Sequence, residues 1–509
     1  MQVNKAKKLF SPTIIFWVIM LVAVILRIGK FIVYEGGLNQ DEASIGYDAY
    51  ALLNYGIDRN GVSLPVHLIA WGSGQNAMYA YLSMPFIAIF GLCAFSVRIV
   101  NFLAAIGTVA AVYFICKELF DKKTALIAMG LTAVAPWHIM LSTWGLESNL
   151  LPAMFTFALL LLVKSFKHPW LICLSAAVFS LCLYTYGSAY VAVPLFMLLA
   201  VITVIKNRLV PIKWISAAFV IFVIMSVPIG LFVLINKFGW DSIKIGPFTI
   251  PAMTGTARIN AMTGSFSLKE TAKDIYNDII MQNDGSYLNA LPIYGCFYVI
   301  SLPFTICGII KAIRSKSIGG KLLIFALIGS LAVFFVLVGT NINRVNIIYI
   351  PLIMLTAVGI NGIIKSRQAA ISVLCAYAVM VCGFSATFYG KGYTQRIEND
   401  TYISLDDAIL YADGISGDNT VYVTPNVNMP YIYVLFYTKE NPHNYLETVQ
   451  IEDTDAQFQW VNSFGKWEFN INGFFNGEKG IYIVDNDYVN SDMRYDIVQF
   501  KKYSVVTID

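Results

Sequence analysis

The chain has 509 residues, of which 57% are hydrophobic and only 13% are charged, with a formal net charge of +4. A soluble domain carries about 25% charged residues, so this composition excludes one large soluble domain. It also excludes a nucleic-acid-binding protein, because the Lys and Arg residues form neither a basic stripe nor a recognisable reader motif. The apolar residues fall in long blocks, which predicts a polytopic membrane protein.

Charge is unevenly distributed along the chain. Residues 391–509 contain 8 Lys+Arg and 18 Asp+Glu, a balance of −10, whereas residues 1–390 contain 27 and 13, a balance of +14. We therefore predict two domains, a mainly α-helical membrane domain over residues 1–390 and an acidic extracytoplasmic domain over residues 391–509.

Basic residues in short loops predict which ends of the spans face the cytoplasm. The first apolar block follows Lys5, Lys7 and Lys8 and lacks a small-residue cleavage site, so we expect a retained span and a cytoplasmic N-terminus. Five more basic loops fit the same side: Cys116–Lys123, Lys164–His168, Lys206–Lys213, Lys311–Lys321 and Lys365–Arg367.

About eleven spans are then expected, at about 12–34, 97–116, 124–143, 149–163, 168–186, 188–205, 213–236, 289–310, 322–340, 345–363 and 369–388. Residues 35–95, the loop 237–288 and the tail lie outside in this arrangement, which predicts a multi-pass plasma-membrane protein. The apolar segment Ala77–Phe95 is interpreted as a helix lying on the outer face, because its crossing would place Cys116–Lys123 outside. The alternative is that it crosses and another segment does not.

The first outer loop carries two adjacent acids at a predicted helix start. Asn39 is expected to cap this helix, with Glu42 closing a capping box and Gly56 ending the helix. Asp41 then lies in the first turn. Two acids at this position are explained either by the helix dipole or by a catalytic carboxylate.

Further polar residues are expected at the outer ends of spans. Arg98 and Arg344 lie there against the positive-inside bias, which favours either contact with lipid headgroups or phosphate binding. Glu147 begins a span, and Asp284 fits a turn in Asn283-Asp284-Gly285.

Other kinds of active site find little support in the sequence. The four histidines are scattered, and they form neither a Ser/His/Asp arrangement nor a metal-ligand cluster. The spacing of the eight cysteines fits neither a zinc site nor a disulfide framework. We therefore predict no metal ligands, while dependence on a divalent metal is left open by the sequence.

The acidic tail has the pattern of a small α/β domain. Ser404–Ala412 is expected to form a helix that is capped by Ser404. Three runs rich in Val, Ile and Tyr predict strands: Thr420–Thr424, Tyr431–Tyr437 and Gly480–Val484. The tail contains no glycine-rich nucleotide-binding loop.

Several of these stretches resemble the protein O-mannosyltransferase and aminoarabinose-transferase group of GT-C glycosyltransferases. The resemblance is carried by Asp41-Glu42, Gln75–Tyr81, Pro85–Gly91, Ser96-Val97-Arg98, Ala125–Glu147, and Arg344 before Ile350-Pro351. The chain departs from the group at Asn76-Ala77, where relatives often have prolines. The tail is similar to the extra outer domains of bacterial members.

The resemblance implies that a sugar passes, with inversion, from a polyprenyl-phosphate donor to an acceptor hydroxyl on the outer face. Asp41 would be the general base, with Glu42 and Glu147 orienting the acceptor or tuning Asp41. Arg98 and Arg344 would bind the donor phosphate. The remaining substrate-binding candidates are Gln75, Asn76, Tyr79, Tyr81 and Asp284. The lipid-linked sugar is the co-substrate, and the acceptor is a protein, a lipid or an envelope polymer.

Two other functions remain as alternatives. A polytopic transporter or flippase of envelope precursors would also have basic inner loops, although transporters place ionisable residues near the middle of the membrane. A non-catalytic assembly or receptor protein is the third possibility, and it leaves Asp41 and Arg98 without a role.

Overall fold

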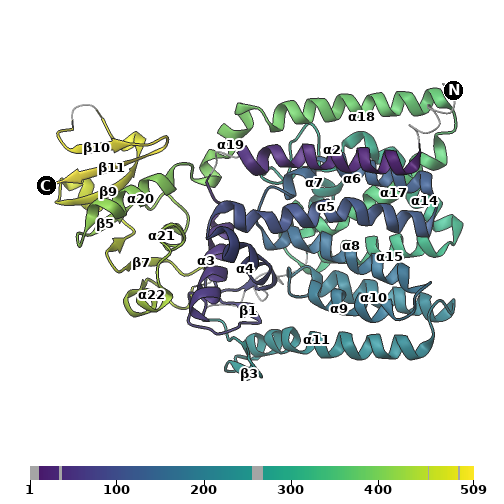
Figure 1. Cartoon of the computed structure of the whole chain (residues 1–509), viewed down its shortest axis with the longest axis horizontal. Helices are drawn as coiled ribbons and strands as arrows, with labels where there is room; N and C mark the ends of the chain where they lie inside the picture. Colours follow the sequence, from purple (N-terminus) through teal and green to yellow (C-terminus); the bar gives the residue numbers. More distant parts are fainter. Residues whose placement is uncertain (1–10, 34–36, 255–266, 457, 491–492) are drawn as a thin grey trace. The chain divides into compact units, whose positions relative to one another are not determined.

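The computed structural model describes residues 11–33, 37–254, 267–456, 458–490 and 493–509 (Figure 1). The basic N-terminus and the centre of the outer loop 237–288 lie outside these residues. The chain forms two compact units. Unit 1 comprises Met1–Ile32, Asn101–Val227 and Met262–Tyr393, and unit 2 comprises Val33–Val100, Pro228–Ala261 and Thr394–Asp509.

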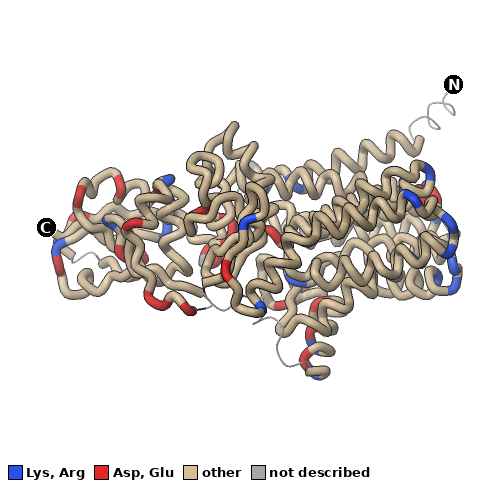
Figure 2. Tube along the Cα trace, turned by 90° about the horizontal axis from the view of Figure 1, so that it is seen from below, with Lys and Arg blue, Asp and Glu red and all other residues tan. Residues whose placement is uncertain are grey.

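The polytopic helical class is confirmed. Within the described residues, eight helical runs are long and apolar enough to cross a membrane. They are α2 (Pro12–Val33), α5 (Ala94–Leu119), α8 (Glu147–Ser165), α10 (Ala189–Lys206), α11 (Ile212–Phe238), α15 (Ile318–Val336), the run Ile342–Ile363 and α18 (Arg367–Phe388). The run Ile342–Ile363 consists of α16 (Ile342–Val345), η3 (Asn346–Ile348) and α17 (Tyr349–Ile363). In unit 1, Lys and Arg gather at one end of the helices (Figure 2).

Three of the eleven expected spans are shorter than predicted. The span at 124–143 is divided into α6 (Lys122–Val134) and α7 (Pro136–Leu141), because Pro136 cannot continue a helix and Ala135 is extended. The span at 168–186 contains α9 (Leu171–Cys182), and the span at 289–310 reaches α14 (Leu302–Ser315) only after turns and η2 (Val299–Ser301). Hydrophobic content alone did not reveal these interruptions.

Helix α4 (Met78–Phe90) corresponds to the apolar segment that was expected to lie on the membrane surface. Its 13 residues span only about 20 Å at about 1.5 Å per residue. A hydrocarbon core is about 30 Å thick, so α4 alone is too short to cross it. This length agrees with the interpretation that Ala77–Phe95 does not cross the membrane, and its place on the outer face stays a prediction.

Two glycines permit a close crossing of α14 and α17 in unit 1. A Cβ atom added at Gly308 would lie 1.8 Å from the Leu355 carbonyl oxygen, and one added at Gly359 would lie 1.9 Å from the Phe304 carbonyl oxygen. Both distances are far below van der Waals contact. Small residues let helix backbones approach in membranes, so these glycines set the α14–α17 spacing.

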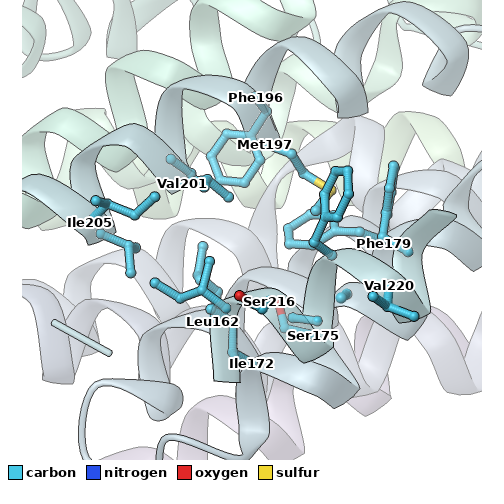
Figure 3. A pocket seen from close by; sticks show the side chains of 17 residues that line it. Leu162, Ile172, Ser175, Phe179, Phe196, Met197, Val201, Ile205, Ser216 and Val220 are labelled. Carbon is cyan, nitrogen blue, oxygen red and sulfur yellow. The ribbon is translucent and has the colours of Figure 1, made fainter. Parts of the chain in front are cut away.

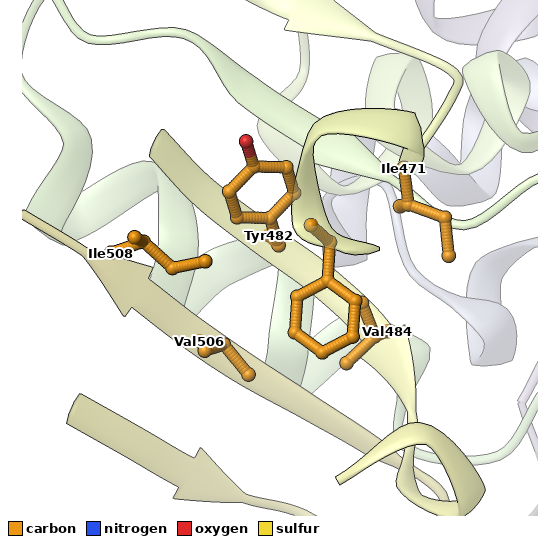
Figure 4. Packing of buried hydrophobic residues seen from close by; sticks show 6 residues of the cluster. Ile471, Tyr482, Val484, Val506 and Ile508 are labelled. Atoms are coloured by element: carbon orange, nitrogen blue, oxygen red, sulfur yellow. The ribbon is translucent and has the colours of Figure 1, made fainter. Parts of the chain in front are cut away.

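The tail contains a seven-stranded mixed sheet with the order β10-β11-β9-β5-β8-β7-β6. Its strands are β5 (Val421–Val423), β6 (Gln450–Ile451), β7 (Val461–Phe464), β8 (Trp467–Glu468), β9 (Gly480–Asp485), β10 (Asp496–Gln499) and β11 (Tyr503–Ile508). Strand β5 is parallel to β8 and β9, whereas β9, β11 and β10 are antiparallel in turn. Tyr482 and Val484 of β9 pack with Val506 and Ile508 of β11 in a buried cluster (Figure 4).

The expected strands at 420–424 and 480–484 correspond to β5 and β9, but the expected strand Tyr431–Tyr437 is wrong. This segment forms α21 (Pro430–Thr438), with Pro430 in its first turn. Residues Pro430–Phe436 are all buried, and a short apolar run of this kind has no periodicity that separates a strand from a buried helix.

The predicted helix at 404–412 is present as α20 (Leu405–Ser416), but its predicted cap is wrong. Ser404 has a φ of 63° and no side-chain capping bond. Its hydroxyl instead accepts a hydrogen bond from the Lys502 backbone N–H at 3.0 Å. A long-range contact therefore replaces the local one.

The remaining elements are short. They are α3 (Gln40–Tyr55), β1 (His67–Leu68), β2 (Gln75–Asn76), β3 (Ile243–Ile245), β4 (Phe248–Ile250), α13 (Leu268–Ile275), the π-helix η1 (Tyr276–Met281), α19 (Lys391–Thr401), α22 (Pro442–Thr448), α23 (Asn472–Asn476) and η4 (Asn486–Tyr488). In unit 2, β1 pairs with β2 and β3 pairs with β4, both antiparallel.

Within unit 2, the tail packs directly on the segment that follows α2 and contains α3. Helix α21 contacts α3, and a Cβ atom added at Gly46 would lie 2.6 Å from the Phe436 ring. The Tyr47 hydroxyl donates to the Glu440 carbonyl at 2.7 Å, and the Gln459 N–H donates to the Trp71 carbonyl at 2.9 Å. The tail therefore supports the loop that carries Asp41 and Glu42.

The helix crossing in unit 1 leads to a stability prediction. Gly359→Ala should lower the free energy of unfolding by about 1–3 kcal/mol, because its methyl group meets the Phe304 carbonyl. Gly230→Ala in α11 is the matched control, since a Cβ atom there has no neighbour within 4 Å. Thermal unfolding of both purified variants in detergent measures the difference. Equal midpoints would show that α14 and α17 separate without cost.

Candidate functional site

The acid pair lies at the start of α3, as the sequence predicts. The Asn39 side-chain oxygen accepts the Asp41 N–H at 2.8 Å, and Glu42 Oε2 accepts the Asn39 N–H at 3.0 Å. The Asn39 side chain also accepts the Glu42 N–H, which completes a capping box with the Glu42–Asn39 bond, and the helix ends at Gly56 in a left-handed conformation with φ of 75°. The local sequence thus fixes both ends of α3.

Glu42 forms a buried bidentate ion pair with Arg98 of α5. Arg98 Nε donates to Glu42 Oε1 and Arg98 Nη2 donates to Glu42 Oε2, both at 2.7 Å. Arg98 Nη2 also donates to the Gly37 carbonyl at 3.0 Å. Glu42 is 0% exposed and Arg98 is 4% exposed. The pair therefore fixes the first turn of α3 to the start of α5.

Asp41 lies in this fixed turn but has a different environment from Glu42. Glu42 is fully buried, whereas Asp41 is partly exposed. The two neighbouring carboxylates therefore have separate parts: Glu42 holds the turn, and Asp41 lies where a solute can reach it.

Gln75 and Asn76 form the second strand of the β1–β2 hairpin. Both are buried, and Gln75 Oε1 accepts the Ser44 hydroxyl of α3 at 2.8 Å. Asn76 is opposite His67 in the strand pair. The hairpin is thus connected to the same helix that carries Asp41.

Tyr79 and Tyr81 extend from the start of α4. The Tyr79 hydroxyl donates to the Val97 carbonyl at 2.9 Å, next to Arg98, and Tyr79 is 0% exposed. The Tyr81 hydroxyl donates to the Pro65 carbonyl at 2.8 Å. In this structure both phenols hold backbone segments of unit 2 in place.

The candidates in unit 1 form a separate group around residues 341–346. Glu147 begins α8, and the adjacent Ser148 hydroxyl donates to Asn343 Oδ1 at 2.6 Å. Arg344 Nη1 donates to the Gly339 carbonyl at 2.8 Å. Glu147 and Arg344 are therefore carried by two segments that are joined through side-chain contacts.

Asp284 contacts the same segment of unit 1. Its Oδ1 accepts the Ser286 N–H at 3.0 Å, as a turn residue would. Its Oδ2 accepts the Asn289 side-chain amide at 2.7 Å and the Ile342 N–H at 3.1 Å. Asp284 thus positions the short helix that contains Arg344.

Sequence reasoning missed a buried charged cluster in unit 2, which consists of Asp48, Asp58 and Arg59. All three are at most 1% exposed, and Arg59 Nε lies 3.9 Å from Asp48 Oδ1. Arg59 Nη2 donates to the Ser44 hydroxyl at 2.8 Å, and its guanidinium lies 4.6 Å from the Trp71 ring centre. The available signal was an Asp-Arg pair between the loop glycines at 56 and 61.

This cluster perturbs the ionisation of its acids. Burial, reinforced by the Asp48 carboxylate, raises the pKa of Asp58 to about 7, against the lowering effect of backbone N–H groups and Arg59. Burial also raises the pKa of Asp48, while Arg59 opposes the shift. Asp58 therefore changes charge near neutral pH.

Within the described ranges, no three His, Cys, Asp or Glu side chains lie close enough together to hold a metal ion. Two buried acids of unit 2 lie beside arginines instead, in the pairs Glu42–Arg98 and Asp48–Arg59.

Asp58 gives a prediction for the pH dependence of stability. The pKa of Asp58 in the folded state is raised from 3.8 to about 7. The protonated carboxyl therefore contributes fully to the free energy of unfolding below about pH 4, and this contribution is lost as pH rises through about 7. Asp58→Asn should remove this decline in the unfolding midpoint, whereas Asp487→Asn on the surface should retain it. Parallel wild-type and Asp58→Asn curves between pH 4 and pH 8 would contradict the buried pKa.

The Glu42–Arg98 pair gives a second prediction. Arg98→Lys keeps the charge but loses the bidentate fork, and leaving a buried acceptor unsatisfied costs about 1–3 kcal/mol. The unfolding midpoint should fall accordingly. Lys167→Ala is the control, because its ion pair with Glu118 is 66% exposed on the lysine side and such pairs contribute about 0–1 kcal/mol. An unchanged midpoint for Arg98→Lys would mean that the pair does not hold the turn.

Comparison with known proteins gives a family match over part of the chain. Residues 75–231 match the family model described as dolichyl-phosphate-mannose-protein mannosyltransferase. This segment includes Arg98 and Glu147 among the candidate residues. A comparison with curated proteins found no match.

Solved structures share the fold over nearly the whole chain. ArnT from Cupriavidus metallidurans bound to undecaprenyl phosphate matches with a TM-score of 0.56 and 12% identity, covering 98% of each chain. The apo form of the same protein matches with a TM-score of 0.55 and 13% identity, covering 97% of this chain and 98% of that one. The apo oligosaccharyltransferase of Archaeoglobus fulgidus matches with a TM-score of 0.54 and 12% identity. The match covers 85% of this chain and 64% of that one. The chain therefore has the fold of ArnT over nearly its full length, and its residues 75–231 match the dolichyl-phosphate-mannose-protein mannosyltransferase family model.

Proposed function

We propose that the chain transfers a sugar from a polyprenyl-phosphate donor to an acceptor hydroxyl at the outer face of the plasma membrane. One observation carries the proposal: Asp41 is partly exposed in a helix turn that the Glu42–Arg98 pair fixes at 2.7 Å. A general base must be held within hydrogen-bond reach of its proton, and this frame supplies such positioning.

In the proposed reaction Asp41 accepts the proton of the acceptor hydroxyl while its oxygen attacks the sugar carbon. The bond to the donor phosphate breaks in the same displacement, so the configuration at that carbon inverts. Polyprenyl phosphate leaves as a stable anion and needs no general acid. A single carboxylate base is therefore sufficient.

Glu42 acts by positioning. Both of its oxygens accept hydrogen bonds from Arg98 and one also accepts the Asn39 N–H, so it fixes the orientation of the neighbouring Asp41. Arg98 was predicted to bind the donor phosphate, and that role stays a prediction. Its contacts with Glu42 and Gly37 give it a positioning role in the structure as it stands.

Arg344 is proposed to stabilise the negative charge that develops on the leaving phosphate. Its Nη1 is directed to backbone carbonyls, and Asp284 and Asn341 fix the short helix that carries it. Glu147 is proposed to contact the substrate from the start of α8.

The hairpin and the start of α4 are proposed to shape the donor region. Gln75, Asn76, Tyr79 and Tyr81 are the predicted substrate contacts there. Three of them already bond to Ser44, Val97 or Pro65, so their part in binding is to hold the backbone that borders the site.

The donor class is supported by what related structures contain. An ArnT structure from Cupriavidus metallidurans is bound to undecaprenyl phosphate, and the archaeal oligosaccharyltransferase AglB from Archaeoglobus fulgidus is in complex with a dolichol-phosphate. Both ligands are a long polyprenyl chain with a phosphate. The proposal assigns this class of donor to the chain, with the sugar left open.

The test of the base is Asp41→Asn, which retains the size of the side chain but removes the proton acceptor. Transfer from a radiolabelled polyprenyl-phosphate sugar to an envelope-lipid fraction should fall by about 10²–10⁴-fold. Asp407→Asn is the matched control, because Asp407 is also an acid in the first turn of a helix, α20. Near-normal transfer by Asp41→Asn would refute the assignment.

An assay on the same purified protein distinguishes the proposed glycosyltransferase from a transporter of the lipid-linked sugar. In proteoliposomes the proposal predicts covalent transfer of label to an acceptor. Movement of the intact lipid-linked sugar across the bilayer, without any transfer, would contradict the proposed function.

A further inference from the structure

A cavity of about 390 Å³ lies among helices α8, α9, α10 and α11 in unit 1 (Figure 3). Cavities that hold small ligands have volumes of about 300–1,000 Å³. The walls are formed by apolar side chains such as Phe179, Phe196 and Val201, with Ser175 and Ser216 as the polar members of the lining. A mainly apolar lining of this kind favours a hydrocarbon chain over a polar ligand.

The cavity reaches the surface that faces the lipid. Two of its lining residues on α11, Phe219 and Val220, are 67% and 52% exposed, and Ile205 at the end of α10 is 46% exposed. Both helices are long and apolar enough to be spans, so their exposed apolar side chains contact lipid chains. A lipid chain can therefore enter the cavity sideways from the bilayer.

The cavity occupies only one leaflet. Its lining on α11 runs from Ile215 to Phe222, and α11 begins at Ile212. The ten helical steps from Ile212 to Phe222 rise by about 15 Å, which is half of a core of about 30 Å. The cavity thus lies in the leaflet next to the basic loop Lys206–Lys213 that joins α10 to α11.

This loop carries three exposed cations, Lys206, Arg208 and Lys213. Among the described residues, none of the three forms an ion pair. The neighbouring loop differs, because Lys164 and Lys167 are both paired with Glu118. Figure 2 shows Lys and Arg gathered at this end of the unit 1 helices. The cavity mouth is therefore next to uncompensated positive charge.

Aromatic residues mark the level of the membrane surface at this end. Trp170 precedes α9 and is 51% exposed, and Trp214 lies in the first turn of α11. Trp residues are enriched at the headgroup level of membranes. A lipid phosphate at this level would lie next to the loop, with its chains directed into the leaflet that contains the cavity.

We propose that the cavity and the Lys206–Lys213 loop form a binding site for an anionic phospholipid of the basic-side leaflet, with one acyl chain in the cavity and the phosphate at the loop. Basic pockets between membrane helices recognise anionic headgroups in this way. The site lies at the end of α8 opposite to Glu147, so it is separate from the one residue of α8 that is proposed to contact the substrate. It does not depend on the proposed function.

The test is native mass spectrometry of the purified full chain with phosphatidylglycerol or phosphatidylcholine of identical acyl chains. Phosphatidylglycerol should bind about tenfold more tightly, since each basic residue near a membrane surface adds to the attraction for anionic lipid. Changing Lys206, Arg208 and Lys213 together to Gln should bring phosphatidylglycerol down to the level of phosphatidylcholine. Lys365→Gln with Arg367→Gln is the matched control, because α18 lies far from α11 in Figure 1.

The acyl-chain part of the site is tested separately. Ala200→Leu fills the cavity from a buried position, and Val201→Trp fills it from a half-buried one that tolerates the added volume. A folded variant of either kind, judged by an unchanged elution volume, should bind both phospholipids several-fold more weakly.

Three results would overturn the proposal. They are equal binding of the two phospholipids, full phosphatidylglycerol binding by the triple Gln variant, and displacement of phosphatidylglycerol by equimolar polyprenyl phosphate. The last result would assign the cavity to the donor lipid.

Discussion

The buried Glu42–Arg98 pair is the contact on which the geometry of the first turn of α3 depends. Two charged groups withdrawn from water are stable only when their geometry is good and their remaining hydrogen-bonding positions are filled. Both conditions are met, because two 2.7 Å bonds join the side chains, and Asn39 and Gly37 take up further positions. The cost of breaking such a pair, about 3–5 kcal/mol, makes the first turn of α3 rigid.

This rigidity is reinforced from several directions within unit 2. Ser44 connects α3 to Gln75 of the hairpin and to Arg59 of the buried cluster, so one hydroxyl joins three segments. From the tail, α21 packs against Gly46, where any side chain would collide with Phe436. The helix turn that carries Asp41 is therefore held in place by a supporting shell of side chains.

The sequence predicts local features of the fold better than long-range ones. The capping box of Asn39 and Glu42 follows from neighbouring residues, and the structure has it as expected. Tyr431–Tyr437 was misjudged because burial on all sides removes the periodicity that separates helix from strand. The span at 124–143 was misjudged because the hydrophobic pattern continues through the break at Pro136.

In the candidate site, too, local features could be predicted from the sequence and long-range contacts could not. Adjacent acids and two arginines were visible in the sequence, but the partner of Arg98 was not, because 56 residues separate Glu42 from Arg98. Asp48, Asp58 and Arg59 escaped notice for a related reason. A buried charge differs from a surface charge only by the tertiary contacts around it, here Trp71 and Tyr431.

A double-mutant cycle on Glu42 and Arg98, with sugar transfer as the readout, tests most directly whether Arg98 acts through Glu42. The variants are Glu42→Gln, Arg98→Gln and the two combined. The account predicts that the double variant loses no more activity than the worse single variant, giving a coupling of about 1–3 kcal/mol. Losses that multiply, with a coupling near zero, would contradict it and would assign Arg98 an independent contact with the substrate.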